Sequence, residues 1–222
     1  MYTKQNKMKC TRRQEQLTPI NVENKEIEQV KAFKFLGSII NIDSTMEEEI
    51  KARIASGNKV YFANKKMFQS RLISKRAKLK VYCSVIRLIV TYSCETWILK
   101  KNIINKLLVF ERKIFGPNNE NGIWRIKSNQ ELDEIIKDKN IINFIRAQRL
   151  SWLGDIERMQ GTRMVKAIYS WKPISRRPTG RPKTRWGDDF RKDIQKIKVP
   201  NWKTLAQDRR RWKELVEKAK TL

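Results

Sequence analysis

The chain has 222 residues, and its 50 Lys and Arg against 23 Asp and Glu give a formal net charge of +27. It contains no histidine, which excludes catalytic pairs built on an imidazole base and most types of zinc site. Such a basic excess is typical of proteins that bind nucleic acid, with a membrane surface or the ribosome as the lesser alternatives.

The cysteines and the apolar segments bear on where the chain resides. Cys10, Cys83 and Cys94 are far apart and form no C-x-x-C pair, so we expect reduced thiols, no disulfide framework and no zinc. The N-terminus lacks the apolar stretch of a secretory signal, and the most apolar run, 81–99, is interrupted by Arg87 and Glu95. We therefore expect a soluble protein of the nucleus or cytoplasm that is neither secreted nor membrane-bound.

Residues 1–42 have the pattern of β-strands. A turn at 23–25 separates two short β-branched runs and predicts a hairpin. The next segment, "AFKFLGSII", alternates Phe33 and Phe35 with Lys34 and Leu36, and Gly37 predicts a bend.

The periodicity becomes helical after residue 43. Ser44 precedes Glu47 by three residues, a capping-box spacing, and an apolar face then continues to about residue 70. Ser74 is placed to cap the next helix. Further helices are expected at 75–93, 102–115, 129–138, 141–159, 162–170, 186–198 and 202–219, and the segment 116–124 reads as a break. The predicted fold class is α+β, mainly α.

Two clusters of basic residues are candidates for nucleic-acid contacts. A charge run is often only a solvated face, but the second cluster also contains prolines, which stiffen the chain, and tryptophans at both ends. We predict contacts with phosphates and little sequence preference. The first cluster comprises Lys75, Arg76, Lys78 and Lys80; the second comprises Arg176, Arg177, Arg181, Lys183 and Arg185, in a Pro/Gly/Arg loop at 172–185.

The adjacent carboxylates of Asp188 and Asp189 allow two interpretations. Polymerases hold catalytic magnesium with an Asp-Asp pair, but such a pair lies at a tight turn between strands. Here the pair precedes the helix-like "FRKDIQKI", where carboxylates stabilise the first turn of a helix. We favour the helix-start interpretation and predict no catalytic residue and no metal ligand in this chain.

Five segments occur in an order that resembles the C-terminal part of the endonuclease–reverse transcriptase encoded by non-LTR (LINE-type) retrotransposons. They are "FKFLGSII" (33–40), "IKARIASGNKVYFANKK" (50–66), "KLKVYCSVIRLIVTYSCETWIL" (78–99), "RAQRLSWLGDIERM" (146–159) and "GRPKTRWGDDF" (180–190). The resemblance extends over nearly the whole chain.

The resemblance implies three regions. Residues 1–42 would be a β-hairpin remnant of the polymerase palm, in which Phe35, Leu36 and Gly37 resemble the primer grip. Residues 43–117 would form a thumb-like helical bundle, and residues 118–222 a basic C-terminal helical region. The implied partners are DNA and RNA, either a template–primer duplex or target DNA.

The chain also departs from this family. The family's catalytic Ala-Asp-Asp motif does not occur in it and would lie upstream of residue 1, as would the endonuclease. At the place where relatives often carry a histidine, it has Gly154-Asp155-Ile156. We therefore expect no cofactor and no polymerase activity in this chain alone, Mg²⁺ belonging to a full-length parent enzyme, which is an RNA-directed DNA polymerase.

Three alternatives stay open at this point: a nucleic-acid-binding fragment of a reverse transcriptase, a stand-alone binding protein derived from one, and a decayed remnant without function. The oligomeric state is not indicated.

Most tryptophans fall on apolar helix stripes and are expected in the core, whereas Trp171 and Trp186 flank the basic loop and are equally suited to stack on bases. Cys83 and Cys94 are expected to be small buried side chains.

Overall fold

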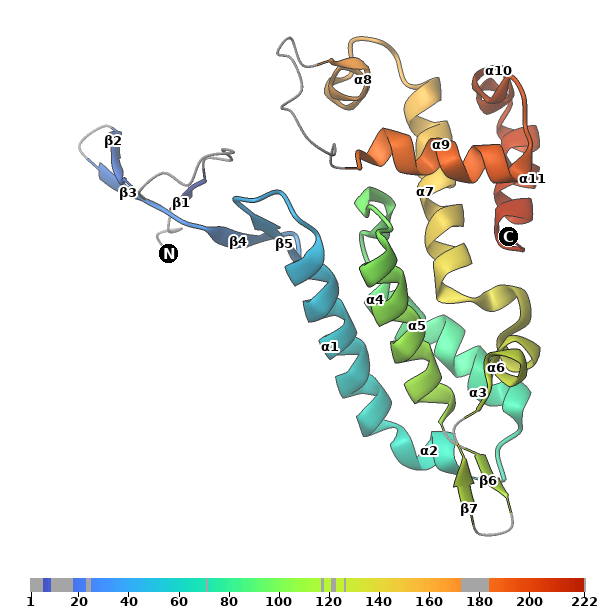
Figure 1. Ribbon diagram of the computed structural model, residues 1–222. Helices are drawn as coiled ribbons and strands as arrows, with labels where there is room; N and C mark the ends of the chain where they lie inside the picture. Colours follow the sequence, from blue (N-terminus) through green and yellow to red (C-terminus); the bar gives the residue numbers. More distant parts are fainter. Residues whose placement is uncertain are drawn as a thin grey trace. The chain divides into compact units, whose positions relative to one another are not determined.

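A computed structural model of the protein describes residues 6–8, 18–22, 25–70, 72–116, 118–120, 123–125, 127–172 and 184–221 (Figure 1). The chain divides into two compact units, residues 1–53 and 54–222, and helix α1 (Glu47–Ala63) contains the boundary. The described structure is mostly helical with small N-terminal β-hairpins, which confirms the predicted α+β, mainly α, class. The second unit contains residues from both the thumb-like and the C-terminal regions proposed above.

The first unit contains a small three-stranded sheet and a separate hairpin. Strand β3 (Lys25–Gln29) pairs antiparallel with β2 (Ile20–Val22), as the sequence predicted, and parallel with β1 (Asn6–Lys7). The second hairpin consists of β4 (Ala32–Phe35) and β5 (Ser38–Asn41), in the register Phe35 with Ser38.

The turn between β4 and β5 has only two residues. Leu36 has φ 47° and Gly37 has φ 86°, and a two-residue turn with positive φ at both positions matches the right-handed twist of the strands that it joins. The bend expected at Gly37 is therefore confirmed as the tip of a tight hairpin.

Helix α1 begins later than the capping-box spacing predicted. Its first residue is Glu47, and Ser44 lies outside it with φ 51°. The Asn41 side chain accepts from the Thr45 amide at 2.9 Å and donates to the Thr45 hydroxyl at 3.1 Å, so Asn41 organises the entry into the helix. The prediction that Ser44 caps this helix is wrong.

The helix expected up to residue 70 is interrupted at Asn64, where α1 ends and α2 (Lys65–Gln69) begins. The interruption has a local cause, because the Asn64 side-chain amide donates to the Val60 carbonyl at 2.8 Å. Such local bonds of asparagine compete with helix continuation.

The helix predicted at 75–93 is present as three consecutive pieces. The Ser74 side chain accepts from the Ala77 amide at 3.2 Å and caps α3 (Lys75–Val81), as expected. A π-helical turn, η1 (Tyr82–Ile86), and α4 (Arg87–Val90) follow, and a 3₁₀ turn, η2 (Cys94–Thr96), leads out of them.

Helix α5 (Lys101–Phe115) ends at Gly116, which has φ 63°. The following segment was expected to be a break without structure, but it contains a short antiparallel hairpin of β6 (Asn118–Glu120) and β7 (Ile123–Arg125). Helix α6 (Asn129–Ile136) and the 3₁₀ turn η3 (Lys137–Lys139) complete this part.

The C-terminal part of the second unit is built around helix α7. Figure 1 shows α11 running beside α7 and α9 crossing it, and all three contact one another. Their buried residues share one core with α10, including Leu150, Leu153, Phe190, Ile194 and Trp212. The helices are α7 (Ile141–Arg158), α8 (Met164–Ser170), α9 (Trp186–Ile197), α10 (Trp202–Gln207) and α11 (Arg209–Ala219).

The single helix predicted at 202–219 is two helices. Asp208 interrupts it, because its carboxylate accepts from the amides of Arg210 and Arg211 at 2.9 and 3.1 Å and so caps a new helix start. Among the helices of the described residues, none has the length and apolar character that crossing a bilayer requires.

Candidate nucleic-acid interface

The four cations predicted on α3 differ in their availability. Lys75, Arg76 and Lys80 are exposed, and within the described residues none of the three forms an ion pair or a hydrogen bond through its side chain. Lys78 is half-buried, and its Nζ donates to the Ser70 carbonyl at 2.7 Å. Three of the four side chains are therefore free to meet an anion, while Lys78 holds the segment that precedes α3.

A fifth cation, Lys127, belongs to this group and was not found in the sequence. Its Nζ donates to the carbonyls of Phe115 and Gly116, each at 2.7 Å, at the end of α5. Burial lowers the pKa of Lys127; the negative charge of Glu131 opposes this shift, and the positive charges of Lys75 and Lys78 add to it. Lys127 therefore lies close to the cations of α3 as well as to Glu131. No local signal in the sequence marked this position.

An ion pair stands beside this region. Arg125 and Glu131 pair at 2.7 Å, and these hydrogen bonds, with one from the Ser128 amide at 2.7 Å, lower the pKa of Glu131 to about 2. Glu131 therefore keeps its charge at neutral pH and is already paired with Arg125.

The second predicted cluster lies mostly outside the described residues. Arg176, Arg177, Arg181 and Lys183 fall in 173–183, of which the structure gives no description. Arg185 is exposed immediately before α9, and its amide donates to the Asp188 carboxylate at 3.3 Å.

Asp188 and Asp189 both lie in the first turn of α9, as the helix-start interpretation predicted. The two carboxylates nevertheless have different environments. Asp188 is half-buried and faces the exposed Arg191 at 3.5 Å, whereas Asp189 is buried and accepts from the Leu99 amide at 2.8 Å. Asp189 thus has a tertiary role that the sequence did not indicate.

A buried arginine, Arg149 of α7, neutralises Asp189. The Arg149 side chain is fully buried and forms ion pairs with Asp189 and with Asp193, one turn later on α9. It also donates to the Trp97 carbonyl at 3.2 Å, and Arg146 approaches Asp193 at 3.4 Å. Because the carboxylates are occupied by guanidinium groups, this arrangement is a structural ion-pair network.

This network joins three of the segments quoted above. Trp97 and Leu99 come from 78–99, Arg149 from 146–159, and Asp189 from 180–190. A further hydrogen bond joins two of these segments, since Trp186 Nε1 in 180–190 donates to the Glu95 carbonyl in 78–99 at 2.8 Å. Within the described residues, no group of three or more His, Cys, Asp or Glu side chains is placed to hold a metal ion.

The predicted primer-grip residues form the tip of the β4–β5 hairpin. Phe35 and Leu36 are exposed, by 54% and 77%, although both are large apolar side chains. The tip is fixed to α1 by two side chains: Arg53 Nη2 donates to the Gly37 carbonyl at 2.6 Å, and Glu49 accepts from the Ile39 amide at 2.7 Å. Arg53 and Glu49 also pair with each other at 2.6 Å.

The two tryptophans that flank the basic loop have different environments in the structure. Trp186 packs against the α7–α11 core, with its ring 5.0 Å from that of Phe190. Trp171 is 66% exposed. Trp97 and Trp212 are buried, as expected; Cys94 is buried as well, whereas Cys83 is only half-buried.

The chain is 23% identical over 207 residues to a Caenorhabditis elegans protein that is named as an uncharacterized transposon-derived protein; the match covers 88% of this chain and 74% of that protein. No protein-family profile matches the chain, and no solved structure does.

Proposed function

We propose that the chain is a nucleic-acid-binding fragment of a non-LTR retrotransposon reverse transcriptase, without polymerase activity of its own. Its similarity to a transposon-derived protein supports an origin in a mobile element. The resemblance of the five segments supports the more specific assignment to the end of the palm, the thumb and the basic C-terminal region. Its substrates would be DNA and RNA, bound through phosphates.

The observation that carries the binding proposal is the positive region on α3. Lys75, Arg76 and Lys80 are exposed on one short helix, and Lys127, whose pKa is lowered chiefly by burial, lies near Lys75. A region in which cations repel one another is stabilised by a bound polyanion, which also releases condensed counterions.

The test is the salt dependence of binding to a labelled DNA duplex. The variant Lys75→Ala/Arg76→Ala/Lys80→Ala should weaken binding to unrelated duplexes by similar factors. It should also flatten the slope of log affinity against log salt by up to about 0.9 for each lost contact on B-form DNA. A charge-matched control is Lys101→Ala/Lys106→Ala/Arg112→Ala on α5, whose three side chains are likewise exposed.

A parallel variant, Arg181→Ala/Lys183→Ala/Arg185→Ala, measures how much the second cluster contributes to the affinity for the duplex. If both clusters touch phosphate, each triple variant flattens the slope and the α5 control does not. Equal losses in all three variants would mean that net charge alone drives binding, and a parent chain that binds no nucleic acid at physiological salt would refute the proposal.

The absence of polymerase activity rests on the sequence and on Asp189. Two-metal phosphoryl transfer needs free carboxylates beside the primer end, and the carboxylate of Asp189 is paired with Arg149. Incubation with primer–template, nucleotides and magnesium or manganese should give no extension. Extension that an Asp188→Asn variant abolished would contradict this assignment.

A further inference from the structure

Helix α8 has two unlike faces. One face holds the helix to the rest of the unit, because Lys166 Nζ and the Tyr169 hydroxyl both reach the Glu157 carboxylate, at 2.6 and 2.9 Å. The Tyr169 ring also lies edge-on to Trp186, with their centroids 6.3 Å apart. None of the side chains of α8 is buried, so the contacts of Lys166 and Tyr169 attach this helix to the rest of the unit.

The other face is apolar and open to solvent. Met164 and Ile168 on α8 and Trp171 just after it are 77%, 66% and 66% exposed, and their spacing of four and three residues puts them on one side of a helical turn. Such a contiguous stripe, which the described residues leave exposed, is characteristic of a binding surface.

Cations stand at both ends of this stripe. Arg163 precedes Met164, and Lys172 follows Trp171; both are exposed, and in the described part of the chain neither side chain forms an ion pair. The nearby carboxylate of Glu157 is already shared by Lys166 and Tyr169. The charge and the apolar surface of the stripe therefore complement a ligand that carries both negative charge and flat apolar groups.

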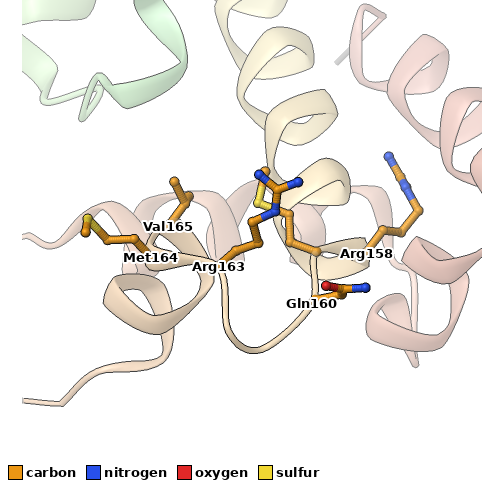
Figure 2. Close-up of a pocket in the computed structure, with 6 residues that line it drawn as sticks. Arg158, Gln160, Arg163, Met164 and Val165 are labelled. Atoms are coloured by element: carbon orange, nitrogen blue, oxygen red, sulfur yellow. The ribbon is translucent and has the colours of Figure 1, made fainter.

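A hollow of about 580 Å³ opens beside the start of α8 (Figure 2). It is lined by Arg158, Met159, Gln160, Arg163, Met164 and Val165, and in Figure 2 the side chains of Arg158 and Arg163 rise on the same side of the turn. Arg158 is held by the Asp155 carboxylate at 2.6 Å and the Ala206 carbonyl at 2.7 Å, whereas Arg163 and Gln160 are exposed. The size suits a ligand of one or two rings.

We propose that the open face of α8 and this hollow bind unpaired nucleotides of single-stranded DNA or RNA. Bases would stack on Trp171 and lie along Ile168 and Met164, and Arg163 and Lys172 would hold the flanking phosphates. The stripe extends over about 10 Å at 1.5 Å per residue, which is the length of two or three stacked nucleotides. This inference rests on the proposed function, to which it adds a class of substrate and a site.

The test uses the full chain and three labelled probes: a 12-nucleotide single-stranded DNA, the RNA of the same sequence, and the DNA duplex. Trp171→Ala should weaken binding of both single strands about tenfold, within the range seen when one stacking aromatic is removed. Trp171→Phe should keep most of the affinity, and duplex binding should stay within about twofold for both variants. The matched control is Val109→Ala on α5, an apolar side chain that is 59% exposed far from α8 in sequence.

Each outcome has one meaning. If the parent chain binds the duplex and the single strands, and Trp171→Ala binds all three probes as the parent does, the α8 site is wrong while the proposed function stands. A chain that binds none of the probes refutes both. If the parent chain dimerises in sedimentation and Ile168→Ser dissociates it without changing single-strand affinity, the open face is a contact between copies, and the nucleotide site is overturned.

Discussion

Trp212 Nε1 donates a hydrogen bond of 2.9 Å to the carbonyl oxygen of Leu150. That carbonyl lies in the middle of α7, one turn before Gly154, and the indole reaches it because Gly154 has no side chain. A Cβ on Gly154 would overlap the indole ring. Gly154 thus makes room on α7 for an aromatic side chain of α11.

The contact predicts a large effect of a very small substitution. Gly154→Ala should lower the free energy of unfolding by about 1–3 kcal/mol, because overpacking in the core outweighs the better helix propensity of alanine. The measurement is urea unfolding followed by circular dichroism. Gly161→Ala is the matched control, since nothing lies within 4 Å of the Cβ that it adds, and equal stability of the two variants would contradict the packing argument.

The neighbouring aspartates at the start of α9 should respond differently to the same change. Asp189→Asn leaves the buried guanidinium of Arg149 with one carboxylate fewer, and breaking a buried ion pair on one side costs about 3–5 kcal/mol. Asp188→Asn removes a contact with the exposed Arg191 and should cost less than about 1 kcal/mol.

Thermal unfolding of these two variants gives the comparison directly. Similar melting temperatures would show that the Arg149 network does not stabilise the fold. In a double-mutant cycle with Arg149→Met, the loss of the Arg149–Asp193 pair is common to both Arg149 variants and cancels, so a coupling energy near zero would contradict a stabilising Arg149–Asp189 pair.

Alkaline pH should destabilise the protein through Tyr82. Its hydroxyl donates to the buried Glu111 carboxylate at 2.7 Å, and burial, followed by the charge of Glu111, raises the pKa of Tyr82 well above its usual value. The neutral phenol is thus favoured in the folded state, so its contribution is complete below the unfolded pKa of about 10 and is lost as the pH rises above it.

The prediction is tested with Tyr82→Phe. Above pH 10, the stability of the parent chain should fall more steeply than that of the variant, by about 1.4 kcal/mol per pH unit for one tyrosine. Tyr61 and Tyr169 also have raised pKa values and remain in both proteins, so only the difference between the two slopes reports on Tyr82. Parallel slopes would contradict the assignment.

The hairpin tip should loosen when Glu49 is removed. Glu49→Ala takes the acceptor from the Ile39 amide and a partner from Arg53, which also donates to the Gly37 carbonyl and the Ser38 hydroxyl. Hydrogen exchange measured by NMR should show faster exchange of the Ile39 amide, while amides of β3 keep their rates. Glu48→Ala, one residue earlier, is the control; unchanged protection of Ile39 in the Glu49 variant would show that strand pairing alone orders the tip.

The positions of most helices were predictable from the sequence, because apolar residues at helical spacing and end signals such as Ser74 and Gly116 act locally. The errors arose where a polar side chain competed with the backbone. Asn64 and Asp208 each interrupt a periodic stripe, and Asn41 organises a helix entry that Ser44 was expected to cap.

The tertiary roles of charged residues could not be predicted in the same way. Nothing local distinguishes Asp189 from Asp188, or Arg149 from the arginines on the surface, because their pairing joins residues 40 and more positions apart. Lys127 was missed for the same reason, since its environment is created by α3 and by the end of α5.

The contact between Tyr169 and Trp186 has a consequence for the chain that joins them. Their ring centroids are 6.3 Å apart, so the helices on either side of the basic segment, α8 and α9, are in contact. Closing such a segment costs entropy that rises only with the logarithm of its length, by about 0.6 kcal/mol for each doubling. The length and composition of this basic segment can therefore change in evolution with little effect on folding. A tag or cross-linker inserted there would report on binding while leaving the helices undisturbed.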